Sequence, residues 1–430
     1  MGLYYIQMRT MNDLPELTDI IDFIEPENEI NDNTDELVET CYELIDDYIM
    51  LNPTAISEPD FEECLTEDLI EMLSIQIDRE LTDKEEDELD EIVEYAITHY
   101  FEIVSPRSYP DTIIISKPDI PPLQIKLDYL KSKPQPVQRT PEWYVFRHNL
   151  ITASNAYKAF ENQNTQNQLI YEKCQPLVIN TSSASQVNIN TTLHWGQKYE
   201  PLSVLIYEYL YNTKVDDFGC IQHEKYSFIG ASPDGINIDP LSDRFGRMLE
   251  IKNIVNREID GIPKKEYWIQ MQMQMETCDL NECDFLETKF TEYENLETYM
   301  EDGEFIQSRD TQLKGVIMYF ANTAGNPVYK YMPLTIQTFD QFTEWETELM
   351  DNVGLTWISN YYWKLDIISC VLVPRNKQWF QSNIHDLETI WNTILEERTT
   401  DYSHRAPNKR PQKTKENNDI VEDQGCLIKL

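Results

Sequence analysis

The chain has 430 residues, with 77 Asp and Glu against 35 Lys and Arg, which gives a formal net charge of −42. Hydrophobic residues make up 41% of it, enough for a substantial core, so wholesale disorder is excluded. Such an acidic balance disfavours nonspecific binding to nucleic acid or to an anionic membrane. Only 12 glycines occur, and no two form a G-x-G, which excludes the glycine-rich loops of Rossmann-type and P-loop nucleotide sites.

The sequence also bears on the compartment. It holds no apolar run of about 18 residues, and residues 1–12 lack the basic-then-apolar pattern of a secretion signal. The 8 cysteines are scattered without a C-x-x-C pair, which disfavours a zinc cluster or a disulfide framework. We therefore expect an intracellular, non-secreted protein that does not associate with membranes. For a viral source this means the host cytoplasm or a viral replication compartment, with the nucleus left open.

Residues 1–104 are predicted to form an acidic, mainly helical region. Residues 1–100 contain 31 acidic residues and only 3 basic ones. Apolar residues recur at helical spacing in residues 35–50 and 82–100. Two interpretations stay open: a small helical bundle with a solvated acidic face, and a module that mimics DNA or docks a partner.

Residues 105–138 are predicted to be a proline-rich, basic linker and the domain boundary. Its prolines oppose regular structure, apart from one strand expected at residues 112–116. The net charge changes from negative in the acidic region to positive in this stretch, which contains four lysines.

Residues 139–350 are predicted to form one α/β domain. Thr140 followed by Pro141 is typical of a helix start, and Ser154 is expected to cap the next helix. A helix is expected at residues 264–277, and strand-like runs at residues 227–231, 247–252, 284–290 and 315–320. Residues 351–400 are predicted to be a helical C-terminal extension of this core, and residues 401–430 a polar, disordered tail.

Two short segments carry the candidate chemistry. Ser-Pro-Asp-Gly at residues 232–235 is, taken alone, an ordinary β-turn, and Glu-Ile-Lys at residues 250–252 is an ordinary strand. Together they say more, because Glu250 and Lys252 share one face of a strand, and a neighbouring turn could bring Asp234 beside them. Two adjacent carboxylates repel unless they are protonated or bound to a cation. A hard divalent ion such as Mg²⁺ takes oxygen ligands of this kind.

This pattern resembles the PD-(D/E)XK nuclease superfamily. Flanking blocks resemble the YqaJ-type viral recombinase family, which includes the lambda phage exonuclease, and they occur in the family order. The blocks lie at residues 139–154, 195–201, 230–235, 249–252 and 267–272. The resemblance covers roughly residues 138–325 and implies a restriction-endonuclease-like core, a central mixed β-sheet flanked by helices. It reaches neither the acidic N-terminal region nor the tail.

The resemblance implies a metal site. Its ligands would be the carboxylates of Asp234 and Glu250 and the carbonyl of Ile251, with Glu200 as an outer or second-metal carboxylate. Because Glu200 precedes a proline, we expect it at the start of a helix. The implied cofactor is Mg²⁺, with Mn²⁺ as a substitute.

The resemblance also assigns the remaining site residues. Lys252 would orient and activate the attacking water, and Gln270 would help to hold the lysine or the water. Gln272 and Gln274 compete for that last role, and in a helix Gln274 shares a face with Gln270. The 5′-phosphate of DNA would be bound by three residues, Arg147, Ser154 and Ser232. Arginine suits this role because its planar fork grips phosphate oxygens, and a serine at a helix N-terminus adds donors for an anion.

The implied activity is metal-dependent hydrolysis of DNA phosphodiester bonds, as a 5′-to-3′ exonuclease on double-stranded DNA ends, in viral recombination, repair or replication. Two alternatives use the same residues: a structure-specific or nicking endonuclease, and a catalytically silent protein that binds DNA ends or a partner. The resemblance further suggests a single-strand annealing protein as partner and a homo-oligomer. As a hypothesis, the acidic N-terminal region occupies a basic groove and restrains activity.

Overall fold

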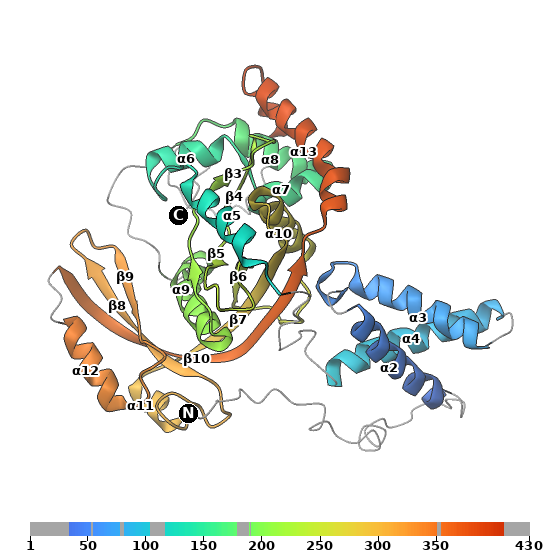
Figure 1. The fold of residues 1–430 in the computed structure, drawn as a ribbon, viewed down its shortest axis with the longest axis horizontal. Coiled ribbons are helices and arrows are strands. Elements are labelled where there is room, and N and C mark those ends of the chain that lie inside the picture. Colours follow the sequence, from blue (N-terminus) through green and yellow to red (C-terminus); the bar gives the residue numbers. More distant parts are fainter. Residues whose placement is uncertain are drawn as a thin grey trace, which may run out of the picture.

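The computed structural model describes residues 34–52, 55–77, 81–103, 117–178, 189, 191–350 and 354–407. A helical module built from the acidic region lies beside a larger mixed α/β body, and the two are drawn in blue and in green to red in Figure 1.

The helical module confirms the helices expected in the acidic region. It consists of α2 (Thr34–Leu51), the 3-10 turn η2 (Ala55–Ser57), α3 (Phe61–Ile77) and α4 (Asp83–Ile103). The apolar stripes meet in one core that includes Cys41, Ile45, Leu65 and Val93. Helix α4 begins with a capping interaction, since the backbone N–H of Thr82 donates to Glu85 Oε2 at 2.9 Å.

The module contacts the α/β body through a small apolar junction. Val371 of the body belongs to the module's buried cluster, and Ile262 packs against it. The acidic side chains of α2, α3 and α4 are mostly exposed. A helical bundle with a solvated acidic face therefore fits the described residues.

The prediction of an irregular linker at residues 105–138 is wrong for its second half. Residues 120–132 form helix α5 (Ile120–Ser132), which buries Leu127 and Leu130 in the main core. Pro121 and Pro122 sit in its first turn, where a missing N–H costs nothing because those groups have no partner within the helix. The strand expected at residues 112–116 lies outside the described residues.

A mixed sheet of seven strands forms the centre of the body. In spatial order its strands are β2 (Val215–Asp216), β5 (Gly235–Asn237), β6 (Met248–Ile254), β7 (Glu282–Tyr293), β10 (Leu355–Pro374), β8 (Lys314–Asn322) and β9 (Pro327–Tyr331). Strands β6 and β7 are parallel and are joined by helix α10 (Lys265–Cys278), whereas the other neighbours pair antiparallel. A smaller sheet has the order β1 (Ile151–Thr152), β4 (Ile229–Ala231) and β3 (Ile221–Gln222). The expected strands and the expected helix at residues 264–277 are thus confirmed, as is a mixed sheet flanked by helices.

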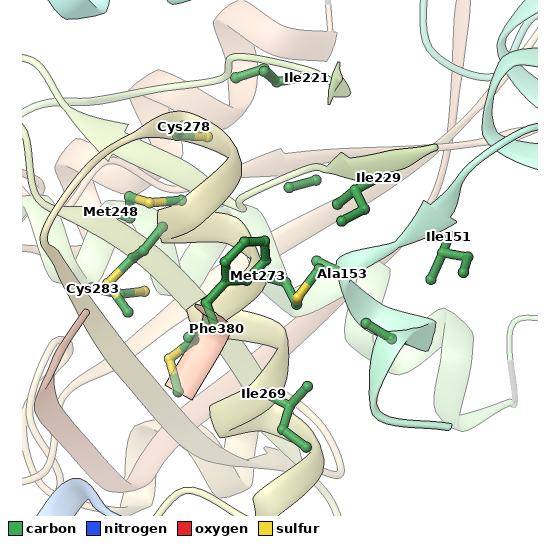
Figure 2. Packing of buried hydrophobic residues seen from close by; sticks show 14 of the residues in the cluster. Ile151, Ala153, Ile221, Ile229, Met248, Ile269, Met273, Cys278, Cys283 and Phe380 are labelled. Atoms are coloured by element: carbon green, nitrogen blue, oxygen red, sulfur yellow. The ribbon is translucent and has the colours of Figure 1, made fainter. Parts of the chain in front are cut away.

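Helices cover both faces of the central sheet. The remaining ones are α6 (Pro141–His148), α7 (Ala153–Ala156), η3 (Tyr157–Phe160), α8 (Gln163–Cys174), α9 (Thr192–Tyr211), α11 (Leu296–Glu301), α12 (Phe339–Met350), α13 (Lys377–Glu397) and η4 (Ser403–Arg405). Helix α10 shares the main core with α7, α8 and α13, and Figure 2 shows Ala153, Ile229, Met273 and Phe380 gathered in it. Helix α9 packs against the opposite face of β6, where Tyr207 meets Leu249.

The prediction that residues 351–400 are wholly helical is wrong for the stretch that forms β10. This strand has 20 residues and pairs with β7 along one part and with β8 along another. Aromatic and β-branched residues dominate its sequence, and they favour a pleated, half-buried surface over a helix. The helical prediction holds for α13. The tail predicted to be disordered from residue 401 is ordered at its start, because residues 403–405 form η4, and it lies outside the described residues from residue 408 onward.

Among the described residues, no helix combines the length and the apolar character that a membrane crossing requires.

Candidate active site

Asp234 ends the turn that leads from β4 into β5. Its backbone N–H donates to Leu249 O at 3.1 Å, and its Oδ2 accepts from the N–H of Ile251 at 2.7 Å. Glycine is required directly after it, because a Cβ at Gly235 would collide with Val215 of β2. The turn therefore places the Asp234 carboxylate against β6, as the sequence pattern predicted.

Glu250 and Lys252 project from the same face of β6. The Glu250 side chain is buried, and its Oε1 forms an ion pair with the Lys252 ammonium. The same ammonium lies 4.8 Å from the centre of the Tyr267 ring, at the start of α10. Strand alternation explains why both residues face α10, whereas Ile251 faces α9.

Two glutamines of α10 hold the Glu250 carboxylate. Gln270 Nε2 donates to Glu250 Oε1 and Gln274 Nε2 donates to Glu250 Oε2, each at 2.7 Å. Gln272 points away and donates to Pro374 O at 2.9 Å. Sequence reasoning favoured Gln270 and left Gln274 as a competitor, but the structure brings both to the site. Gln274 could have been found from its spacing, because it follows Gln270 by four residues and the two side chains therefore share one helix face.

The carboxylates of the site repel one another. Burial, together with the nearby carboxylates of Glu250 and Glu200, raises the pKa of Asp234 well above its usual range. Burial acts to lower the pKa of Lys252, but the carboxylates of Glu250 and Asp234 outweigh it, so the pKa is raised and the side chain stays a cation. The site thus gathers more negative charge than its one lysine balances.

Glu200 lies near the middle of α9, so its predicted position at a helix start is wrong. Pro201 sits inside this helix, which continues because Tyr199 and Leu202 on either side are fully buried. Packing of these side chains overrides the preference of a pre-proline residue for extended backbone. The surrounding protein and the carboxylate of Glu250 raise the pKa of Glu200, although its side chain keeps access to solvent. The structure therefore places Glu200 within electrostatic reach of the other two carboxylates.

Arg147 and Ser232 meet beside the Asp234 turn. Thr140 caps α6 as predicted, accepting from the N–H of Trp143 at 3.3 Å. Arg147, in the last turn of α6, donates through Nη1 to Ser232 Oγ at 2.8 Å, and its guanidinium lies 4.8 Å from the centre of the Trp143 ring. Because Ser232 is two residues before Asp234, this arginine binds the same segment that carries the Asp234 carboxylate.

A buried lysine adds positive charge beside Arg147. Lys173 of α8 donates to Arg147 O at 2.9 Å. Burial, with repulsion from Arg147 and Arg398, lowers the pKa of Lys173 to about 8. Sequence reasoning missed Lys173, because nothing in its sequence context distinguishes it from a surface lysine. Clustered cations of this kind suit an anionic ligand.

Ser154 is not the N-cap of its helix, which corrects that expectation. The N-cap of α7 is Thr152, and Ser154 is the second residue of this four-residue helix, exposed and 3.2 Å from Thr152 Oγ1. Strand β1 runs parallel to β4 and pairs Thr152 with Gly230. The segment that carries Ser154 therefore lies alongside the segment that leads to Ser232.

The connection between β5 and β6 is fastened by buried ion pairs. Arg244 and Arg247 both contact the carboxylate of Asp284 on β7, and the Arg247 Nη1 to Asp284 Oδ1 distance is 3.0 Å. Tyr207 of α9 donates its hydroxyl to Asp284 Oδ2 at 2.6 Å. These side chains tie the strand of Glu250 to β7 and α9.

The donor set fits a hard divalent cation. Two carboxylates and a backbone carbonyl are oxygen ligands of the type that Mg²⁺ and Mn²⁺ prefer, and the raised pKa of Asp234 reflects a charge that a cation would neutralise. Within the described ranges, no three His, Cys, Asp or Glu side chains lie close enough together to form a ready-made metal cage. Ligands from the backbone, from water or from a phosphate would complete the set, as is usual for Mg²⁺.

This electrostatic picture makes a prediction for the metal-free protein. The pKa of Asp234 is raised above that of the unfolded chain, so protonation favours the folded state, and this contribution is lost as pH rises through the raised pKa. In the presence of a chelator near pH 8, Asp234→Asn should therefore raise Tm by about 2–4 °C. The difference should shrink toward acidic pH, and Mg²⁺ should raise the Tm of the wild type but not that of the variant. Thermal unfolding with chelator and with Mg²⁺ measures both, and equal metal responses would contradict a metal site at Asp234.

Comparisons with known proteins agree with the sequence motifs. Residues 142–281 match the family model of the YqaJ-like viral recombinase domain. This range contains Arg147, Glu200, Asp234, Glu250 and Lys252, so the resemblance is confirmed for the part of the chain that carries the site.

A curated relative and two solved structures extend the comparison. An uncharacterized protein of Acanthamoeba polyphaga mimivirus is 31% identical over 309 residues, covering 63% of this chain and 54% of the relative. The chain thus spans about half of the length of that relative. An alkaline exonuclease from Laribacter hongkongensis, LHK-Exo, is 18% identical with a TM-score of 0.34, and its complex with dAMP is 19% identical with a TM-score of 0.32. Each solved structure covers 62% of this chain and 95% of its own chain.

Proposed function

We propose that the protein is a Mg²⁺-dependent deoxyribonuclease that degrades linear double-stranded DNA from its ends, 5′ to 3′, in viral DNA recombination, repair or replication. The observation that carries this proposal is one turn: Ser232 binds Arg147, and Asp234, two residues later, binds the β6 strand that carries Glu250 and Lys252. A pocket for a terminal phosphate and a hydrolytic site are therefore neighbours.

The metal ion would be held by Asp234, Glu250 and the carbonyl of Ile251, with Glu200 in reach of a second ion. When bound, such an ion lowers the pKa of a bound water and stabilises charge on phosphate oxygens. Gln270 and Gln274 fix both oxygens of Glu250, so this carboxylate is pre-oriented for the cation. Mn²⁺ is the proposed substitute, because it accepts the same oxygen ligands.

Lys252 is proposed to orient the attacking water and to stabilise negative charge at the scissile phosphate. Its pKa is raised, so in the metal-free site it is a cation that donates hydrogen bonds and not a base that accepts a proton. Its contact with Tyr267 limits where the ammonium can lie. A fixed cation beside the reacting phosphate lowers the barrier without forming a covalent intermediate.

The pocket at Arg147 is proposed to make the enzyme depend on DNA ends. A terminal phosphate carries more negative charge than a phosphodiester and exposes a further oxygen, which a guanidinium can grip through two N–H groups. Ser232 and Ser154 offer hydroxyl groups on neighbouring segments. Lys173 adds positive charge next to the backbone of Arg147. A single-strand annealing partner and a homo-oligomer are further proposals, which rest on the family resemblance.

The experiment that tests end-dependence compares linear duplexes with 5′-phosphate and with 5′-hydroxyl ends. The wild type should prefer the phosphorylated duplex, and Arg147→Ala should reduce this preference by about 10- to 100-fold, because a charge-assisted pair worth about 1.5–3 kcal/mol is lost. Arg309→Ala is the matched control, since this exposed arginine hydrogen-bonds to Glu301 and Asp302 at the end of α11. An unchanged preference in Arg147→Ala would refute a phosphate pocket at this arginine.

A further inference from the structure

Strands β8 and β9 and the first half of β10 extend the sheet beyond the helices that carry the site, as Figure 1 shows. This extension differs in charge from the rest of the chain. Residues 314–338 and 354–365 contain three lysines and no Asp or Glu, in a protein with 77 acidic residues. These strands therefore contribute no carboxylates within a strongly acidic chain, which reduces their repulsion of a polyanion.

Three tyrosine rings gather on one face of the extension. Tyr319 of β8 pairs directly with Tyr329 of β9, and their ring centroids are 5.3 Å apart. Tyr361 of β10 stacks on Tyr319 at 6.0 Å with an interplanar angle of 25°. Cross-strand partners point to the same side of a sheet, so the rings form one continuous surface, which we call the tyrosine platform.

The other face of the extension is a conventional core. There, Val316 of β8 and Met332, which follows β9, pack against Phe342 of α12, and all three are buried. The three rings of the tyrosine platform are only half-buried. The tyrosine face also carries core residues, because Tyr329 and Tyr361 pack against the buried Ile317 and Trp363. The three rings lie at the edge of that core and stay partly accessible.

The tyrosine platform adjoins the candidate active site through α9. The Lys198 ammonium lies 4.1 Å from the centre of the Tyr361 ring and pairs with Glu292 of β7. Tyr331, next along β9, donates its hydroxyl to Lys198 O at 2.7 Å. Glu200 belongs to the same helix, so α9 connects the platform to the carboxylate cluster.

We propose that the tyrosine platform, Tyr319, Tyr329 and Tyr361, stacks the bases of single-stranded DNA beside the active site. Every base has an apolar face, and aromatic side chains on strands that contribute no carboxylates can bind such bases without sequence preference. This inference rests on the proposed function and deepens it, because digestion of one strand leaves the other single-stranded next to Glu200. The platform would then guide that strand away from the reacting end.

The test measures binding to short oligothymidylate and to an abasic oligonucleotide of equal length, with chelator, in the full chain carrying Lys252→Ala. The unmodified platform should bind oligothymidylate about tenfold more tightly than the abasic strand. Tyr319→Ser with Tyr329→Ser should bring the two affinities to within about twofold. Tyr319→Phe with Tyr329→Phe should keep the preference, since the rings are retained. Tyr209→Ser, at an exposed tyrosine of α9, is the matched control.

Equal affinity for the two oligonucleotides, or a serine variant that keeps the preference, would overturn the platform. If the serine variant is less stable, the phenylalanine variant decides, because loss of preference there excludes base stacking. A wild type that digests linear duplex without ring-dependent binding keeps the proposed function and loses the platform. If binding depends on the rings but the wild type digests no linear duplex, the platform stands and the proposed function fails. The proposal would also be overturned if the tyrosine substitutions weakened the binding of another protein and left the binding of DNA unchanged.

Discussion

Lys252→Ala is expected to lower the rate of DNA hydrolysis by about 100- to 1,000-fold, because the site loses its only described cation in contact with Glu250. The removed ammonium can no longer orient water or offset charge at the phosphate, and the repulsion between the carboxylates grows. The measurement is the release of labelled nucleotides from a linear duplex in Mg²⁺, at saturating and at limiting DNA.

Lys264→Ala is the control for that variant. This lysine immediately precedes α10 and is exposed, so its replacement changes the charge equally but leaves the site intact. Both variants should unfold at temperatures close to that of the wild type. Activity of Lys252→Ala within about threefold of the wild type would refute the assigned role of Lys252, because a residue that stabilises the transition state costs far more when it is removed.

Asp284→Ala is expected to destabilise the protein by about 3–5 kcal/mol, the cost of removing one partner of a buried ion pair. Arg244 and Arg247 would lose a shared buried carboxylate, and the hydroxyl of Tyr207 would lose its acceptor. Unfolding in urea, followed by fluorescence, measures the loss. Because the network anchors the strand of Glu250, the variant should also lose activity at temperatures where it is still folded.

Asp243→Ala provides the matched comparison for stability. This residue lies in the same connection between β5 and β6 but is exposed, so its replacement should change the free energy of unfolding by less than about 0.5 kcal/mol. A loss below about 1 kcal/mol for Asp284→Ala would show that the buried ion pairs do not fasten the strand hairpin.

The centre of the site could be predicted because it depends on local rules. Alternation along a strand puts Glu250 and Lys252 on one face, and the Ser-Pro-Asp-Gly sequence predicts the turn that delivers Asp234. Gln274 required knowledge of which face of α10 meets β6, although its spacing from Gln270 was visible. Lys173 comes from α8, and only tertiary packing brings it beside Arg147.

The fold was less predictable where local preference and tertiary context disagree. Helix α5 begins with two prolines, which oppose a helix interior but suit a first turn, and only the buried Leu127 and Leu130 show that the helix is held in place. Strand β10 is rich in aromatic residues at spacings that also suit a helix, and its pairing with β7 and β8 decides the outcome. Glu200 shows the same conflict, since packing on both sides of Pro201 keeps α9 continuous.

The most direct test of end-dependent hydrolysis is incubation of the wild type with 5′-phosphorylated linear duplex DNA and a closed circle of the same sequence, with Mg²⁺ and with chelator. The account predicts that the linear DNA disappears in Mg²⁺, that chelator preserves it, and that the circle stays intact. Cutting of the circle would contradict end-dependence and favour an endonuclease at the same residues. Survival of both molecules, also after removal of the acidic helical module, would contradict nuclease activity altogether.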